Sequence, residues 1–208
     1  TVVTQGKSFS KVLKGSTGDL FTVVCGSFAK DGRHLLYVEE GLTPKVVRLD
    51  AQLVPSEELA LKDLVIDGVK WTGVTGIIDN GALRCLLVSN GKKSAEYGIG
   101  TVNTAGPLAI TGFRKLATFD LNYTNDPAFT MVSRPLPDPI LFTRGLAYVQ
   151  RERLIASPDG NRYLLNHFTN EAKGDKLFQF AILDKDFTVL SNGSATLPYE
   201  DAKSSIHQ

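Results

Sequence analysis

The residues best suited to metal binding or nucleophilic chemistry are few and widely separated. They are two cysteines and three histidines: Cys25, Cys85, His34, His167 and His207. Structural zinc sites use short spacings such as C-x-x-C or H-x-x-x-H, and none of these occurs here. We therefore expect neither a metal nor another cofactor. His34 and His167 fall in strand-like stretches, where a hydrogen-bonded sheet histidine is more common than a catalytic one.

Sequence motifs of the large enzyme classes do not occur in this chain. It has no G-x-S-x-G elbow, Walker loop or H-E-x-x-H, and Gly98-Ile99-Gly100 lacks the third glycine and the following helix of a dinucleotide site. Asp184-Lys185-Asp186 resembles the start of a calcium loop, but the later ligand positions hold the wrong residues, so we interpret it as a solvated turn. We assign no catalytic residue.

The most unusual segment runs from Asn122 to Gly145. Four prolines interrupt any strand ladder there: Pro127, Pro135, Pro137 and Pro139. Arg134, Asp138 and Arg144 in the same segment could present a polar recognition surface, and they are our candidate binding residues. A plain linker is the simpler interpretation, because Pro-rich stretches often only space neighbouring elements.

Trp71 and the two cysteines each have a functional and a structural interpretation. Trp71, the only tryptophan, could stack on a sugar or peptide at a rim, but core packing is favoured because a buried aromatic covers roughly 150–250 Å². Cys25 and Cys85 both lie in apolar runs and are expected to be buried. A disulfide between them is conceivable in an oxidising compartment, although buried free cysteines are common and we favour free thiols.

Composition places the chain among ordinary globular proteins. Of its 208 residues, 42% are hydrophobic and 22% charged, and the formal net charge is +1. Without a basic cluster, binding to nucleic acid or anionic lipid is not expected. No apolar stretch approaches the roughly 20 residues of a membrane-spanning helix, so we expect no transmembrane segment.

Asx-Gly pairs recur along the chain between strand-like stretches, as expected for hairpin turns in which both residues need positive φ. The pairs are Asp31-Gly32, Asp67-Gly68, Asn80-Gly81, Asn90-Gly91, Asp159-Gly160 and Asn192-Gly193. The strand candidates are 20–29, 34–40, 45–50, 71–79, 83–89, 96–103, 162–169 and 176–184. The stretch 55–64 could be a short helix capped by Ser56, or a turn followed by a strand.

Apolar residues alternate along several of these strands, and the order of turns and strands repeats along the chain. Leu83, Cys85 and Leu87 share one face at period two, as do Phe178, Phe180 and Ile182. Three stretches each combine an Asx-Gly hairpin with a later strand ending in Asp or Asn, followed by a short link and an apolar residue. The three strands end at Asp50, Asn103 and Asp184.

This recurrence predicts an all-β chain of repeated four-stranded meanders, which is a β-propeller-like fold. We expect residues 1–208 to form a single β-domain with approximate repeat units 20–66, 68–120 and 140–200. Three units do not comfortably close a ring of four to eight blades, so an incomplete propeller is expected. A β-sandwich with the same hairpins is the alternative.

One of these turns lies in a recognisable motif. Ser157-Pro158-Asp159-Gly160, followed by the strand Arg162 to Leu165, resembles the blade signature of TolB-like propellers. The C-terminal third is also similar to uncharacterised exported propeller-like proteins of Gram-negative bacteria. The resemblance implies a propeller-like fold and an exported, periplasmic or cell-envelope location, and it implies no catalytic residues.

Two functional hypotheses follow. The first is a non-enzymatic binding or scaffold module of the bacterial envelope that recognises a protein or glycan through its loops. The alternative is a hydrolase acting on saccharide or peptide, with carboxylates supplied by loops that converge only in three dimensions. Two carboxylates facing each other roughly 5–9.5 Å apart in a cleft would favour a glycosidase.

Overall fold

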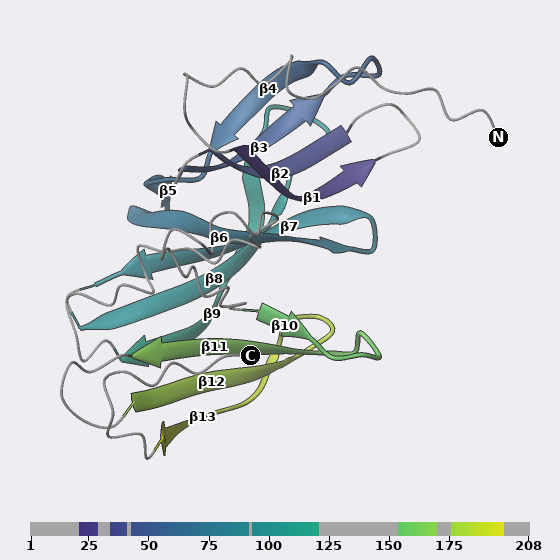
Figure 1. The fold of residues 1–208 in the computed structure, drawn as a ribbon. Coiled ribbons are helices and arrows are strands. Elements are labelled where there is room, and N and C mark those ends of the chain that lie inside the picture. Colours follow the sequence, from purple (N-terminus) through teal and green to yellow (C-terminus); the bar gives the residue numbers. More distant parts are fainter. Residues whose placement is uncertain are drawn as a thin grey trace, which may run out of the picture. The chain divides into compact units, whose positions relative to one another are not determined.

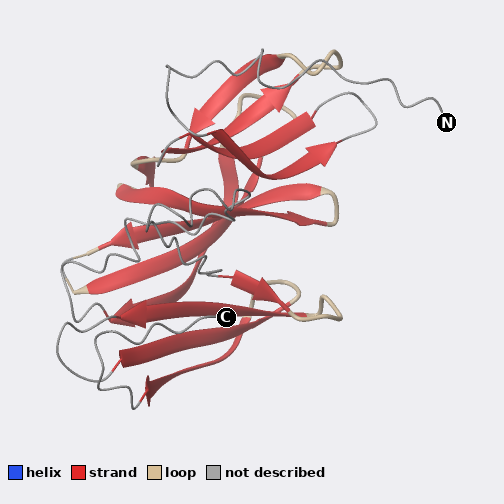
Figure 2. Cartoon of the chain, in the orientation of Figure 1, coloured by secondary structure: helices blue, strands red, loops and turns tan. Residues whose placement is uncertain are grey.

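The computed structural model describes residues 21–28, 34–40, 43–91, 93–120, 154–169 and 176–197, and these ranges form strands and turns only (Figure 2). The first sheet contains β1 (Phe21–Phe28), β2 (His34–Glu40), β3 (Thr43–Leu49) and β4 (Pro55–Ala60). The middle sheet contains β5 (Leu64–Ile66), β6 (Val69–Asp79), β7 (Ala82–Asn90), β8 (Ser94–Val102) and β9 (Ile110–Asp120). The third contains β10 (Leu154–Ala156), β11 (Arg162–Thr169), β12 (Lys176–Asp184) and β13 (Val189–Leu197).

In every sheet the order of strands in space is their order along the chain (Figure 1). The first and third sheets are four-stranded antiparallel meanders, and the middle sheet adds the short β5 to the same plan. The predicted all-β fold of repeated antiparallel meanders is confirmed. It is consistent with an incomplete propeller and with the alternative β-sandwich. The boundaries predicted for the repeat units, 20–66, 68–120 and 140–200, stay a prediction.

The chain forms two compact units. The first comprises residues 1–87 and 99–114, and the second comprises residues 88–98 and 115–208. The boundary runs through the middle sheet, because β7, β8 and β9 each contribute residues to both units. Each unit has a core of its own.

The core of the first unit joins the first sheet to residues of the middle sheet. Its buried members are Leu35, Tyr37, Val46, Leu61, Trp71, Leu83, Cys85, Leu87, Val102 and Leu108. Leu83, Cys85 and Leu87 are all buried in it, which confirms their shared face. Leu36 and Val38, the alternate residues of β2, belong to a second cluster with Val47 and Leu49. Both faces of β2 are therefore covered, which explains why its sequence reads as an apolar run.

Two of the predicted hairpin tips have the expected geometry. Both residues of Asp67-Gly68 and of Asn80-Gly81 have positive φ, at 51° and 78° and at 48° and 79°. These turns join β5 to β6 and β6 to β7. Asp31-Gly32 lies outside the described residues. In the first of these hairpins Ile66 is the partner of Val69, which is the register of a two-residue turn.

The prediction of a hairpin tip at Asn192-Gly193 is wrong. Both residues lie within β13, where Gly193 is the partner of Phe180 on β12. A Cβ at Gly193 would lie only 3.0 Å from Cζ of Phe180. The glycine therefore makes room for the Phe180 ring, and it does not serve a turn.

The aspartates at the ends of β3 and β12 organise two turns of the same geometry. One Asp50 carboxylate oxygen accepts the backbone N–H groups of Gln52 and Val54, each at 2.9 Å. Asp184 accepts those of Asp186 and Thr188 at 2.9 and 2.7 Å. The Asp184 carboxylate thus caps its own turn. This agrees with the solvated turn, in place of a calcium loop, that the sequence led us to expect.

The fourth residue of each turn is apolar and has a left-handed backbone conformation. Leu53 and Phe187 both have φ of 61°, and their N–H groups bond the carbonyls of Asp50 and Asp184 at 2.9 Å. The Phe187 side chain is buried and stacks on Tyr163 with ring centroids 4.5 Å apart. The apolar residues that follow these two strands thus pack against other apolar side chains.

The ambiguous stretch 55–64 begins with a strand, not a helix. β4 pairs antiparallel with β3, and its side chains alternate between half-buried and exposed. Ser56 does not cap a helix, since its hydroxyl donates to the backbone carbonyl of Arg48 at 3.3 Å. The apolar spacing fitted either element, and pairing with β3 decided between them.

Candidate functional site

The candidate binding residues Arg134, Asp138 and Arg144 lie outside the described residues. The structure does describe both ends of the connection that carries them, which leaves β9 at Asp120 and enters β10 at Leu154. At the start of this connection the structure describes a polar contact between Asp120 and Gln179. It is therefore the candidate functional site.

Gln179 clamps the last residue of β9. Its side-chain carbonyl accepts the backbone N–H of Asp120 at 2.9 Å, and its side-chain N–H donates to the Asp120 carbonyl at 2.8 Å. The amide thus pairs with Asp120 much as a neighbouring strand would. Gln179 is buried on β12 with 7% of its surface exposed, so water competes little for these bonds. The point from which residues 121–153 depart is tied to the third sheet.

The alternation of β12 contained a signal for Gln179. Phe178, Phe180 and Ile182 do share one face, and the rings of the two phenylalanines stack 5.7 Å apart. The opposite face, with Gln179 and Ala181, is the more buried one. A polar residue in phase with buried residues requires a hydrogen-bonding partner, although the sequence does not say which.

An aromatic cluster that includes a histidine lies in the core of the second unit. His167 of β11 is fully buried, and its Nδ1 lies 3.1 Å from the hydroxyl of Tyr97 on β8. Its ring stacks on Phe119 of β9, with centroids 5.7 Å apart and an interplanar angle of 17°. Tyr97 also packs against Phe119. These contacts give His167 a place in the core, in line with the sheet histidine expected from the sequence.

Tyr97→Phe is expected to lower the free energy of unfolding by roughly 1–2 kcal/mol, because it removes a hydrogen bond from a buried imidazole. Denaturant unfolding measures the change. Tyr97→Phe with His167→Phe should cost less than the sum of the two single changes, since it removes both polar partners together. Strict additivity would contradict a direct interaction between the two side chains.

A partly buried network in the first unit centres on Arg48 of β3. Its guanidinium bonds the Glu57 carboxylate of β4 at 2.7 Å and the backbone carbonyls of Asn103 and Gly106 at 3.3 and 2.7 Å. The second oxygen of Glu57 accepts the backbone N–H of Leu108 at 2.7 Å. The pair therefore fastens the β8–β9 loop to the first sheet. The charges of Arg48 and Glu57 therefore stabilise the fold of the first unit.

The two cysteines are free thiols, as the sequence analysis favoured. Cys85 is buried, and the half-buried Cys25 packs against the same apolar cluster. Burial raises the pKa of the Cys25 thiol to about 11 and that of Cys85 further. Both thiols therefore stay protonated at neutral pH, and a thiol is a much weaker nucleophile than a thiolate.

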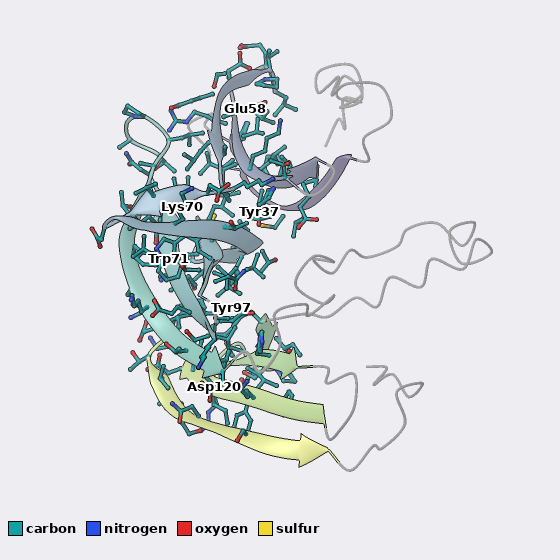
Figure 3. The ribbon with its side chains drawn as sticks, turned by 90° about the vertical axis from the view of Figure 1, so that its left-hand side faces the viewer. Tyr37, Glu58, Lys70, Trp71, Tyr97 and Asp120 are labelled. Atoms are coloured by element: carbon teal, nitrogen blue, oxygen red, sulfur yellow. The ribbon has the colours of Figure 1, made fainter. Side chains whose placement is uncertain are left out.

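Trp71 is a core residue, which confirms the interpretation that the sequence favoured. Only 1% of its surface is exposed, and its ring meets Phe113 edge-on with centroids 4.7 Å apart. Figure 3 labels Trp71 on β6 and Tyr37 on β2, which belong to the same buried cluster. A ring covered in this way does not offer a stacking surface to a sugar.

The Ser-Pro-Asp-Gly turn before β11 is held by its own side chains. Asp159 accepts the Ser157 hydroxyl at 2.6 Å and the backbone N–H of Asn161 at 3.1 Å. The Ser157 hydroxyl oxygen accepts the backbone N–H of Arg162 at 2.9 Å. Gly160 has φ of 68°, a conformation that glycine adopts without strain. The Ser-Pro-Asp-Gly motif thus encodes a self-contained turn.

The same turn predicts a small acid-dependent loss of stability. The Ser157 hydroxyl, followed by the Asn161 N–H groups, lowers the pKa of Asp159 from 3.8 to about 2. A lowered pKa in the folded state stabilises the fold above pH 4, and this contribution disappears as the pH falls from about 4 to 2. Ser157→Ala should reduce this dependence, as measured by unfolding at a series of pH values. An unchanged acid profile would contradict the role of the Ser157 hydroxyl.

The described part of the chain contains neither a metal-binding cluster nor a membrane-spanning helix. No three His, Cys, Asp or Glu side chains gather there into a group able to hold a metal ion. No helix long and apolar enough to cross a membrane occurs in these residues. Several carboxylates contact cations, such as Asp79 with Arg84 at 2.7 Å and Glu58 with Lys45 at 3.0 Å.

Comparison with known proteins gives no family assignment. No protein-family model matches the sequence. No curated protein matches it either.

Proposed function

We propose that the protein is a non-enzymatic binding or scaffold module of the bacterial cell envelope, and that residues 121–153 carry its recognition surface for a protein or glycan. The observation that carries the proposal is the clamp of Gln179 on Asp120. Binding loops are most effective when a rigid element fixes the point from which they depart, because less conformational freedom is then lost on binding.

The polar networks around this point support a scaffold. Arg48 and Glu57 bond backbone groups of the β8–β9 loop, and Asp50 and Asp184 cap turns. Each of these charges is engaged in holding the fold. Arg134, Asp138 and Arg144 are charged groups in the connection, and guanidinium groups recognise carboxylates and phosphates in bidentate fashion. The envelope location rests on the resemblance to exported propeller-like proteins.

Binding of the full chain to a glycan microarray and to an array of immobilised peptides tests the proposal. The triple variant Arg134→Ala, Asp138→Ala, Arg144→Ala should lose at least about tenfold in affinity for any ligand found, since each charged contact contributes on the order of 1 kcal/mol or more. Arg114→Ala, Lys185→Ala, Asp186→Ala is the matched control, because it removes the same charges from exposed side chains of other segments.

A variant of Gln179 tests separately whether the clamp on Asp120 supports binding by residues 121–153. Gln179→Leu should weaken binding of the same ligand while the fold remains, as judged by circular dichroism. Equal binding by the wild type and the triple variant would rule out the connection as the recognition surface. Turnover of an arrayed glycan or peptide by the wild type would instead support the hydrolase alternative.

A further inference from the structure

Exposed sheet edges in proteins usually carry a feature that prevents pairing with another strand, such as shortness, a bulge, a proline or a charge. The edge strands β5 and β10 have three residues each. β1 has an irregularity between Val23 and Cys25. β4 carries Pro55 and two glutamates, and β9 carries Arg114, Lys115 and Asp120. Among the described strands, five of the six sheet edges are thus protected.

β13 is the exception from Ser191 onward, because its own register shift lies before that residue. Its nine residues, VLSNGSATL, include no charge and no proline. The register with β12 shifts at the start of β13 but then runs without interruption from Ser191 to Leu197. All side chains from Val189 to Ala195 are exposed, including Leu190 at 54%. Alternate residues of such a strand direct their backbone N–H and C=O groups away from the sheet, where they can pair with another strand.

The sequence of β13 is compatible with pairing to itself. In an antiparallel arrangement centred on Gly193, the two glycines oppose each other, Asn192 opposes Ser194, and Ser191 opposes Ala195. These side chains are small and uncharged, so no like charges meet across the pair. A second copy also supplies the self-complementary surface that two-fold dimers use, and two-fold dimers are the commonest protein oligomers.

We propose that β13 pairs with β13 of a second copy of this chain, antiparallel and centred on Gly193, so that two third sheets join into one continuous sheet. The occupant of the edge is thus the protein itself. This inference is independent of the proposed ligand-binding role of residues 121–153.

The register makes the experiment specific. Asn192→Lys with Ser194→Lys places lysines opposite each other twice and should raise the dimer dissociation constant at least about tenfold. Asn192→Glu with Ser194→Lys places unlike charges at the same two points and should restore dimerisation. Sedimentation equilibrium over a range of concentrations of the full chain measures both. Gln52→Lys with Thr118→Lys adds the same charge as the first variant at exposed positions away from β13 and is the control.

Three outcomes would overturn the proposal. One is a wild-type chain that stays monomeric up to its highest soluble concentration. Another is a dimer that the two lysines leave unchanged. The third is a dimer that the lysines dissociate but the glutamate–lysine variant does not restore, because the self-paired register would then be wrong. Circular dichroism of each variant shows that the charges act on association and not on folding.

Discussion

Gly76→Val is expected to lower the free energy of unfolding by roughly 3 kcal/mol or more, at the upper end of overpacking effects. A Cβ at Gly76 would lie 2.6 Å from Cβ of Tyr37 and 2.7 Å from Sγ of Cys25. The Tyr37 Cβ is attached directly to the backbone of β2, so it cannot move aside without shifting the strand. Urea unfolding followed by the fluorescence of Trp71, which lies in the same core, measures the effect.

Gly106→Val is the control for this substitution. At Gly106 the nearest atom to a built Cβ is the Asn103 Nδ2, at an ordinary 3.4 Å. The Gly106 carbonyl accepts a hydrogen bond from Arg48, but a side chain added at Cα leaves this backbone group in place, so the cost should stay within about 1 kcal/mol. Similar losses at the two glycines would contradict the close approach of β6 to Tyr37.

Arg48→Met should destabilise the fold by roughly 2–3 kcal/mol, because it strands the partly buried Glu57 carboxylate and two backbone carbonyls. The side chains of Arg48 and Glu57 are only 17% and 33% exposed, so water replaces the lost bonds incompletely. Methionine retains much of the aliphatic length. Equilibrium denaturation gives the free energy, and hydrogen exchange at the Leu108 amide, which Glu57 accepts, reports local loosening.

Lys45→Met provides the comparison on the same strand. Lys45 contacts Glu58, whose side chain is 47% exposed, and such surface pairs contribute about 0–1 kcal/mol. In a double-mutant cycle, Arg48→Met and Glu57→Gln should be clearly non-additive. If Arg48→Met lowered the free energy of unfolding no more than Lys45→Met does, the Arg48 guanidinium would not be what holds the β8–β9 loop to the first sheet.

Local patterns predicted several elements closely. β2, β11 and β12 have the bounds expected from the sequence, and Asn80-Gly81 is the tight turn its residue types favour. These features depend on short-range causes: side chains alternate at period two along a strand, and glycine adopts positive φ without strain.

The orientation of Cys25 shows what local patterns miss. The register of β1 with β2 shifts between Val23 and Cys25, so Cys25 becomes the partner of Tyr37. Tyr37 faces the large core cluster, and Cys25 packs against that cluster as well. A single bulge reverses which face the rest of a strand presents, and the sequence carries no reliable mark of it.

The candidate site was predictable only in part. The Pro-rich segment directed attention to the connection between β9 and β10, but Arg134, Asp138 and Arg144 stay predictions. The clamp of Gln179 on Asp120 joins residues that are distant in the chain. No pattern in the sequence pairs a buried glutamine with a particular backbone amide, because such a partner is defined only once the strands have packed.

The sequence by itself determined the all-β class, the repeated meanders and the turns at Asp67-Gly68 and Asn80-Gly81, because these follow from alternation and from the φ preferences of glycine, asparagine and aspartate. The tertiary structure decided that 55–60 is a strand, that Asn192-Gly193 lies inside β13, and that Arg48, Gln179 and His167 have the partners described above. The physical reason is the sequence separation over which each interaction acts. Turn and strand propensities act between near neighbours, whereas strand pairing and the hydrogen bonding of buried polar groups depend on residues far apart in the chain.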